Sequence, residues 1–461
     1  MKTIHSHFIF IFLISCLIAI FLSSCDDFVK VDLPDSQLTT PAVFEDKATA
    51  TAAITAIYSK IRDNSILSGA PNGLSHALAL YTDELDYYGA TTFPTALYGN
   101  SLSSNDTELR NLWTVTYNQI YAVNSILQGL ENSSAIALTD RHILKGEAYF
   151  IRALLHFYLT NLYGPIPYIS TTDYTINSKV PKLSVDSVYA LAKADLDEAL
   201  KLLPQAYITP QRTRPNVYTA HALLARVNLY MGLWAEAANE ASAVLNQTDL
   251  YLMVGIDQTF KSNSSGTLWQ LSTTSTSTNT EEGSTFIFQS GPPPRSALTT
   301  SFLLSFETND ERKNQWIRAV SNGTSTWYHP YKYQNKMNEG NANEQSILLR
   351  LEEQYLIRSE ARVRQGDFIG AKEDLNVIRN RAGLANTAAV TEPEILTAIM
   401  KERQHELFTE LGHRFFDLKR NGLTAALAST KPGWDANDVL FPIPESEMLL
   451  NPNLKPQNPG Y

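Results

Sequence analysis

Two clusters of aromatic side chains lie in polar, Gly- and Asn-containing segments rather than at helical core spacing. A pyranose ring has an apolar face of C–H bonds and a fringe of hydroxyl groups. A Trp or Tyr ring can cover that face while Asn, Asp, Gln or Arg side chains bind the hydroxyls. The alternative is that these rings are buried anchors of their loops. The predicted ligand-binding residues are Tyr81, Asp83, Tyr87, Tyr88 and Tyr98 in the first cluster, which also holds Phe93, and Trp327, Tyr328 and Tyr331 in the second, which also holds Tyr333.

The sequence contains no set of residues that is typical of catalysis. A glycosidase needs two carboxylates that face one bond, and Asp83, Glu84 and Asp86 are the nearest approach to such a pair. With 47 acidic residues, close pairs arise by chance, and these three could instead bind a cation or accept hydrogen bonds from a sugar. His405 and His413 lack zincin spacing and are interpreted as a structural pair on one helix. We therefore expect no catalytic residue, no metal site and no cofactor.

Charged residues in the C-terminal third are interpreted as part of the scaffold. They recur at helical spacing and predict structural ion pairs or buried caps. The residues concerned are Arg350, Glu353, Arg358 and Glu360, followed by Arg403, Glu406, Glu410 and Arg414.

The composition excludes several classes of protein. The 461 residues are 44% hydrophobic, which is enough for a large core. The formal net charge is −10 and no basic tract occurs, so nucleic acid and anionic lipid are not expected partners. Cys16 and Cys25 are the only cysteines, so disulfides are not expected in the mature protein.

The N-terminus has the pattern of a lipoprotein signal. Lys2 precedes an apolar run, Phe8–Leu22, which is shorter than the roughly 20 residues that a membrane span needs. The sequence Leu-Ser-Ser-Cys that ends at Cys25 looks like a bacterial lipobox. It predicts a signal peptide over 1–24, lipid on Cys25 and a short tether over 26–41. An ordinary signal peptide is the alternative.

Helical periodicity dominates the rest of the chain and predicts a mainly α fold. About four irregular TPR-like helix pairs are expected, with turns at Gly232 and at Gly366-Asp367. Proline punctuation predicts that 440–461 is an extended strap without helix. Helices are expected at 48–61, 109–130, 139–163, 184–203, 215–246 and 348–384. Loop-rich insertions are expected at about 63–105 and 248–345, the latter with short strands at 267–271 and 286–289.

The order of these segments resembles the SusD/RagB family of surface lipoproteins. The resemblance rests on 152–167, 214–240, 348–384, 402–422 and 441–461, the last of which ends in Asn-Pro-Gly-Tyr. It implies a single SusD-like domain over 25–461, anchored in the outer membrane and facing outward. It also implies a ligand site between the early and central insertions, and a SusC-like TonB-dependent transporter as partner.

The resemblance leaves the ligand open. We expect capture of an oligosaccharide without turnover and its delivery to the transporter. Peptide capture, as in RagB-like members, is the nearest alternative. A helical glycoside hydrolase and a TPR-like adaptor without a small ligand are the others.

Overall fold

The computed structural model describes residues 40–461. They belong to two compact units, of which the first contributes only the short helix α2 (Thr40–Val43), and the second runs from Phe44 to Tyr461. The predicted signal peptide, Cys25 and nearly all of the predicted tether lie outside the described residues. Within 40–461, no helix combines the length and the apolar character that crossing a membrane requires.

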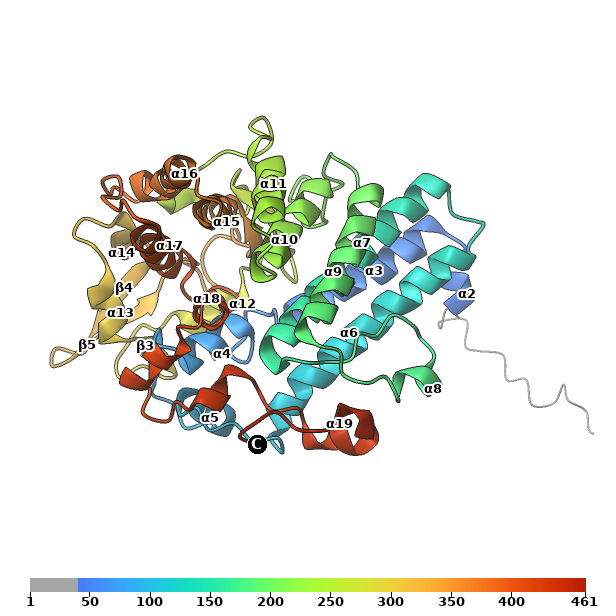
Figure 1. The fold of residues 1–461 in the computed structure, drawn as a ribbon, viewed down its shortest axis with the longest axis horizontal. Helices are drawn as coiled ribbons and strands as arrows, with labels where there is room; N and C mark the ends of the chain where they lie inside the picture. The colour runs from blue at the N-terminus through green and yellow to red at the C-terminus, as the bar shows by residue number, and fades with distance from the viewer. Residues whose placement is uncertain (1–39) are drawn as a thin grey trace, which may run out of the picture. The chain divides into compact units, whose positions relative to one another are not determined.

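Helices account for most of the regular secondary structure of the second unit, which confirms the predicted mainly α fold. Figure 1 shows α3, α6, α7 and α9 side by side, and α11 packs between α10 and α15. The helices are α3 (Lys47–Asp63), α6 (Thr107–Asn132), α7 (Leu138–Tyr163), α9 (Val185–Leu202), α10 (Val217–Tyr230), α11 (Trp234–Leu245), α15 (Leu351–Arg364), α16 (Phe368–Arg381), α17 (Glu392–Leu407) and α18 (His413–Arg420).

The turn between α15 and α16 has the predicted geometry. Gly366 has φ +81°, a conformation that a side chain disfavours, and the Asp367 carboxylate accepts a hydrogen bond from the Gly370 N–H at 2.9 Å. Gly232, φ +71°, makes the corresponding turn between α10 and α11. Small side chains let these pairs approach closely, and the residues shared by α10, α11 and α15 are Ala225, Leu229, Ala237, Ala241, Ile357 and Ala361.

Short elements fill the two insertions. Three two-stranded antiparallel sheets occur among the described residues, with pairings β1–β3, β2–β6 and β4–β5. The strands are β1 (Leu85–Tyr87), β2 (Thr267–Leu271), β3 (Ser296–Leu298), β4 (Ile317–Ser321), β5 (Thr326–Pro330) and β6 (Ser346–Arg350). The short helices are α4 (Leu74–Tyr81), α5 (Thr92–Tyr98), α8 (Tyr174–Asn177), α12 (Glu281–Phe286), α13 (Thr300–Ser305), α14 (Glu311–Gln315) and α19 (Glu445–Leu450).

Two local predictions are wrong. No strand forms at 286–289. Phe286 is the last residue of helix α12, and residues 287–289 lie in neither a helix nor a strand. The acidic first turn of α12, Glu281-Glu282, suits a helix N-terminus. The C-terminal strap is not free of helix either, since α19 begins directly after Pro444, a position where a proline costs no helical hydrogen bond. The last residues do pack on the body: Asn458 Nδ2 donates to the Tyr163 carbonyl at 2.8 Å.

A buried ionic network joins the central insertion to the C-terminal helices. Arg350, at the end of β6, lies 2.6 Å from Glu406 and 2.8 Å from Glu410. Burial alone would raise the pKa of Glu406, but the guanidinium groups of Arg381, Arg350 and Arg312 hold this pKa below its ordinary value. The predicted scaffold role of these residues is confirmed, although the pairs connect different elements rather than turns of one helix.

The turn between α17 and α18, residues 408–412, is where the insertions meet the scaffold. Thr409, Leu411 and Gly412 all have φ between +47° and +75°. Such backbone persists only where the surroundings impose it. The Thr409 N–H donates to buried Glu84 at 3.3 Å, and Lys332 donates to the Phe408 carbonyl at 2.8 Å.

Replacing Arg350 tests the buried network. Arg350→Gln removes the main counter-charge of Glu410 and one of the three arginines paired with Glu406 inside the protein, so we expect a loss of about 3–5 kcal/mol in the free energy of unfolding. Urea unfolding at pH 7 measures this loss. Lys201→Gln removes the same charge at an exposed position, and its effect should stay within about 0.5 kcal/mol. Equal stability of the two variants would contradict the assigned role of Arg350.

Glu84 should make stability fall as the pH rises. Burial, then the nearby Asp83 charge, raises the pKa of Glu84 from 4.5 to about 8. Between these two values the unfolded chain releases a proton that the folded protein keeps, so folding is penalised progressively toward pH 8. Wild type should lose about 2–5 kcal/mol relative to Glu84→Gln between pH 4.5 and 8, measured by urea unfolding. Glu373→Gln, at an exposed position, should show no such difference from wild type. If the free energy of unfolding of wild type and of Glu84→Gln changed in parallel with pH, the raised pKa of Glu84 would be contradicted.

Candidate functional site

A three-residue sheet brings the early insertion onto the central one. Strand β1 pairs antiparallel with β3, with Leu85 opposite Leu298 and Tyr87 opposite Ser296. The pairing extends one residue further, because the Tyr88 N–H donates to the Arg295 carbonyl at 2.7 Å. Tyr88 therefore leaves the sheet at the edge of the central insertion, with 44% of its surface exposed.

Trp327 lies beside Tyr88. It is on β5, opposite Val320 of β4, and its ring lies against the backbone of Gly291. A Cβ atom on Gly291 would lie 2.1 Å from the Trp327 ring, so only glycine allows this approach. Burial and the Asp86 carboxylate raise the pKa of Tyr88, and the N–H group of the neighbouring Trp327 indole opposes that rise. The two aromatic clusters of the sequence thus meet at this pair.

Tyr98 and Asp86 complete the surface. The Tyr98 hydroxyl donates to the Asp86 carboxylate at 3.2 Å, and 36% of Tyr98 is exposed. Lys431 Nζ lies 4.0 Å from the centre of the Tyr98 ring and donates to the Leu80 carbonyl. Burial lowers the pKa of Lys431 to about 8. We call Tyr88, Tyr98, Trp327 and Asp86 the aromatic platform; it presents accessible rings next to a carboxylate acceptor, the combination that a sugar face and its hydroxyls require.

Three predicted residues of the early insertion lie elsewhere. Tyr81 is fully buried in α4, with its ring against Phe415 and Phe441 and its hydroxyl bonded to the Asp438 carbonyl at 3.1 Å, so the prediction that it contacts a ligand is wrong. Asp83 is paired with Arg414 at 2.6 Å. Tyr87 points away from the platform and accepts a hydrogen bond from the Thr91 N–H at 3.1 Å.

The predicted ligand-binding residues of the central insertion also lie in different places. Successive side chains of a strand point to opposite faces, so Tyr328 lies on the other face of the β4–β5 hairpin from Trp327. Tyr331, just beyond β5, lies beneath Arg318, whose guanidinium is 4.4 Å from the ring centre. The two remaining aromatic residues, Phe93 and Tyr333, are buried.

The acidic residues near the platform do not converge on one bond. Asp83 is held by Arg414, Glu84 is buried under the 408–412 turn, and only Asp86 faces the platform. Among residues 40–461, no group of three or more His, Cys, Asp or Glu side chains is arranged to hold a metal ion.

The two histidines do not share a helix, which corrects the sequence-based interpretation. His405 is in α17 and His413 begins α18 beyond the 408–412 turn. Both are buried, and His405 stacks on Phe306 with ring centres 4.3 Å apart. Burial, then the nearby Arg312, lowers the pKa of His405 to about 2, so its ring is neutral.

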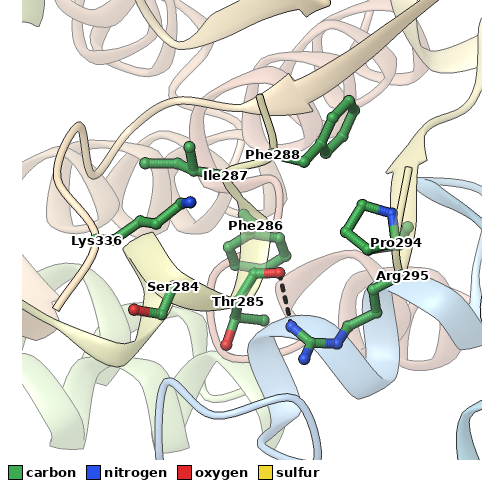
Figure 2. A pocket seen from close by; sticks show the side chains of 9 residues that line it. Ser284, Thr285, Phe286, Ile287, Phe288, Pro294, Arg295 and Lys336 are labelled. Atoms are coloured by element: carbon green, nitrogen blue, oxygen red, sulfur yellow. Dashed lines mark hydrogen bonds between the residues drawn. The ribbon is translucent and has the colours of Figure 1, made fainter. Parts of the chain in front are cut away.

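A cavity of about 230 Å³ lies in the segment that supports the platform. Its lining comprises Ser284–Phe288, Pro294–Ser296 and Lys336. Figure 2 shows its side chains, with the Arg295 guanidinium bonded to the Thr285 carbonyl. The Phe288 ring connects the cavity to β5, because its centre lies 5.0 Å from that of His329.

A second, larger groove has a volume of about 470 Å³ and was not predicted from the sequence. It lies along α6, α8 and α19, and Tyr121 and Tyr174 expose 50% and 78% of their surfaces there. Trp113 and Tyr117 lie about one helical turn apart on α6. Trp113 is buried, but the half-buried Tyr117 forms part of the groove wall. Tyr121 follows four residues after Tyr117 on the same face of the helix. This row of aromatic residues was the sequence pattern that could have indicated the groove.

Comparison with known proteins identifies the fold. Residues 32–229 match the SusD-like family described as starch-binding and associating with the outer membrane, and residues 278–461 match the SusD family that includes RagB. A SusD-like protein, P2, of Formosa agariphila is 27% identical over 413 residues, which cover 74% of this chain and 79% of that protein.

Solved structures agree with these matches. A SusD superfamily protein from Bacteroides vulgatus has a TM-score of 0.79 at 22% identity and covers 90% of this chain and 99% of its own. A laminarin-binding SusD-like protein has a TM-score of 0.76 at 24% identity, with the same two coverages. The family matches, the curated relative and the shared fold agree along most of the length, and this chain therefore belongs to the SusD/RagB family.

Proposed function

We propose that this protein captures an oligosaccharide at the aromatic platform and delivers it, without catalysis, to a SusC-like TonB-dependent transporter. The observation that carries the proposal is the β1–β3 pairing, which brings the exposed Tyr88 and Tyr98 next to Trp327 and the Asp86 carboxylate. Stacking of a ring on the apolar face of a sugar costs little desolvation free energy, because no polar group is left buried without a partner.

Two further observations support carbohydrate as the ligand. The matched family carries the description starch-binding, and one structural neighbour binds laminarin. The separation of Asp83, Glu84 and Asp86 into different environments supports binding without turnover, since hydrolysis by a carboxylate pair needs both groups at the same bond.

We propose further that the protein lies on the outside of the outer membrane. Lipid on Cys25 would anchor it, and the transporter would bind part of the surface of the second unit. The predicted tether, 26–41, separates this anchor from the first long helix, α3.

Substitutions on the two faces of β5 test the platform. Trp327→Ala or Tyr88→Ala should weaken glycan binding by about 1–3 kcal/mol, because each removes one stacking ring. Tyr328→Ala is the matched control, since it removes a ring from the same strand but from the opposite face. Isothermal titration calorimetry with soluble oligosaccharides, laminari-oligosaccharides among them, measures the change.

Each of the other outcomes would indicate a different function or a different site. Release of reducing ends during the titration would indicate a glycoside hydrolase, and heat only with peptides would indicate a RagB-like peptide binder. Loss of binding in Tyr121→Ala but not in Trp327→Ala would move the site to the groove along α6. No heat with any glycan or peptide would favour an adaptor.

Membrane attachment and the partner can be tested together. Wild-type protein, isolated by affinity from detergent-solubilised outer membranes of its own bacterium, should carry a TonB-dependent barrel with it. Cys25→Ser lacks the acceptor thiol, so it should leave the membrane fraction and lose the barrel. Recovery of Cys25→Ser in the membrane fraction at wild-type level without the barrel would contradict lipid anchoring at this residue.

A further inference from the structure

The cavity next to the platform carries positive charge and no acidic group. Its lining contains Arg295 and Lys336, and the remaining members are hydroxyl-bearing, apolar or proline residues. Figure 2 shows the two cationic side chains reaching the cavity from opposite sides of the Phe286 ring. This local charge contrasts with the net charge of −10 of the whole chain.

Neither cation is neutralised by a close partner. The Arg295 guanidinium donates to the Thr285 carbonyl at 3.1 Å, and no carboxylate of the described residues lies within ion-pair distance of it. A guanidinium has five N–H donors, so most remain for a ligand. Lys336 has one partner, Glu339, at 3.7 Å, and 56% of that carboxylate side chain is exposed. An exposed pair of this length contributes little and exchanges readily with a better acceptor.

The floor of the cavity is neutral. Ser296 Oγ lies 3.0 Å from His76 Nε2, while His76 Nδ1 lies 2.7 Å from the Pro71 carbonyl. A carbonyl only accepts, so Nδ1 carries the proton and Nε2 accepts from the serine hydroxyl. Burial lowers the pKa of His76 to about 4, so the ring adds no charge of its own.

The cavity and the platform form one continuous region. The Arg295 carbonyl accepts the Tyr88 N–H, and the Phe288 ring of the cavity contacts His329, two residues after Trp327 on β5. Arg318 lies opposite His329 in the β4–β5 register. Burial, and then the positive charges of Arg318 and Lys336, lower the pKa of the His329 imidazole. A ligand whose ring stacks on the platform therefore lies beside a region with three cationic side chains.

From this arrangement we infer that the cavity accepts an anionic substituent of the captured glycan, so that the ligand class is an acidic oligosaccharide. A carboxylate of a uronic acid and a sulfate ester share the chemistry required: acceptor oxygens with negative charge for the guanidinium and the ammonium group. The inference rests on the proposed glycan-binding function and deepens it by naming the ligand class.

Matched pairs of glycans test the inference. Oligogalacturonates are compared with their carboxyl-reduced forms, and chemically sulfated laminari-oligosaccharides with the unmodified ones, all by calorimetry at two salt concentrations. Wild type should bind the charged member of at least one pair about tenfold or more tightly, and this preference should shrink as salt is raised. The pair that shows the preference distinguishes carboxylate from sulfate.

Charge variants then locate the effect. Arg295→Gln and Lys336→Gln should each weaken binding of the charged member about tenfold and leave the neutral member unchanged. Arg295→Lys, which keeps the charge, should retain most of the preference. Lys201→Gln is the control for loss of a positive charge far from the cavity. Lys336 makes no buried contact on which folding depends, so its variant remains informative if the Arg295 variants fold poorly.

Failure of this inference is distinguishable from failure of the proposed function. Equal binding of charged and neutral members by wild type, or unchanged binding of the charged member by Lys336→Gln and Arg295→Gln, overturns the acidic ligand while glycan capture stands. Absence of binding to every glycan, or wild-type binding by Trp327→Ala, overturns the platform itself.

Discussion

The arrangement of the whole second unit depends on the turn at 408–412. Three of its residues have positive φ, and none of the surrounding helices would impose that conformation alone. Side chains from both insertions reach it: Glu84 and Ser75 from the early one, Lys332 from the central one. The ionic network around Arg350 and Glu406 lies directly behind it. The turn is therefore the point at which two loop-rich segments become part of one rigid body.

This constraint explains how so small a sheet can carry a binding surface. A two-stranded sheet of three residues per strand is not stable by itself in water. Here β1 follows α4, which is buried against α18, and β3 leads into α13. The rigid scaffold places the sheet, and the sheet places Tyr88 against Trp327. Rings held in this way lose little conformational freedom on binding, which favours affinity.

Charge is distributed unevenly around this surface. Most arginines of the second unit pair with carboxylates, and several of these pairs are buried, as with Arg226 and Glu353 at 2.6 Å and Arg152 and Asp195 at 2.6 Å. Such pairs are costly unless their geometry is good, and they specify which helices meet. Arg295 and Arg318, in the central insertion, have no carboxylate partner among the described residues. Their donors remain available, and the region beside the platform is positive within an acidic protein.

Local sequence information was sufficient for the scaffold. The long helices, the turns at Gly232 and Gly366, and the cap at Asp367 follow from a 3.6-residue period and from backbone preferences that act over a few residues. The same reasoning failed where two distant segments meet. His405 and His413 fit one helical stripe, yet the helix ends between them because Glu84 and Ser75, more than 300 residues earlier, hold the intervening turn.

The candidate site shows the same division. The sequence by itself determined a mainly α protein with two aromatic, polar insertions, because composition and periodicity are local properties. Only the tertiary structure decided that Tyr88 is exposed and Tyr81 buried, that Trp327 and not Tyr328 faces Tyr88, and that residues 85–87 pair with 296–298. These outcomes depend on contacts between segments more than 200 residues apart, and the free energy of such contacts is not contained in either segment alone.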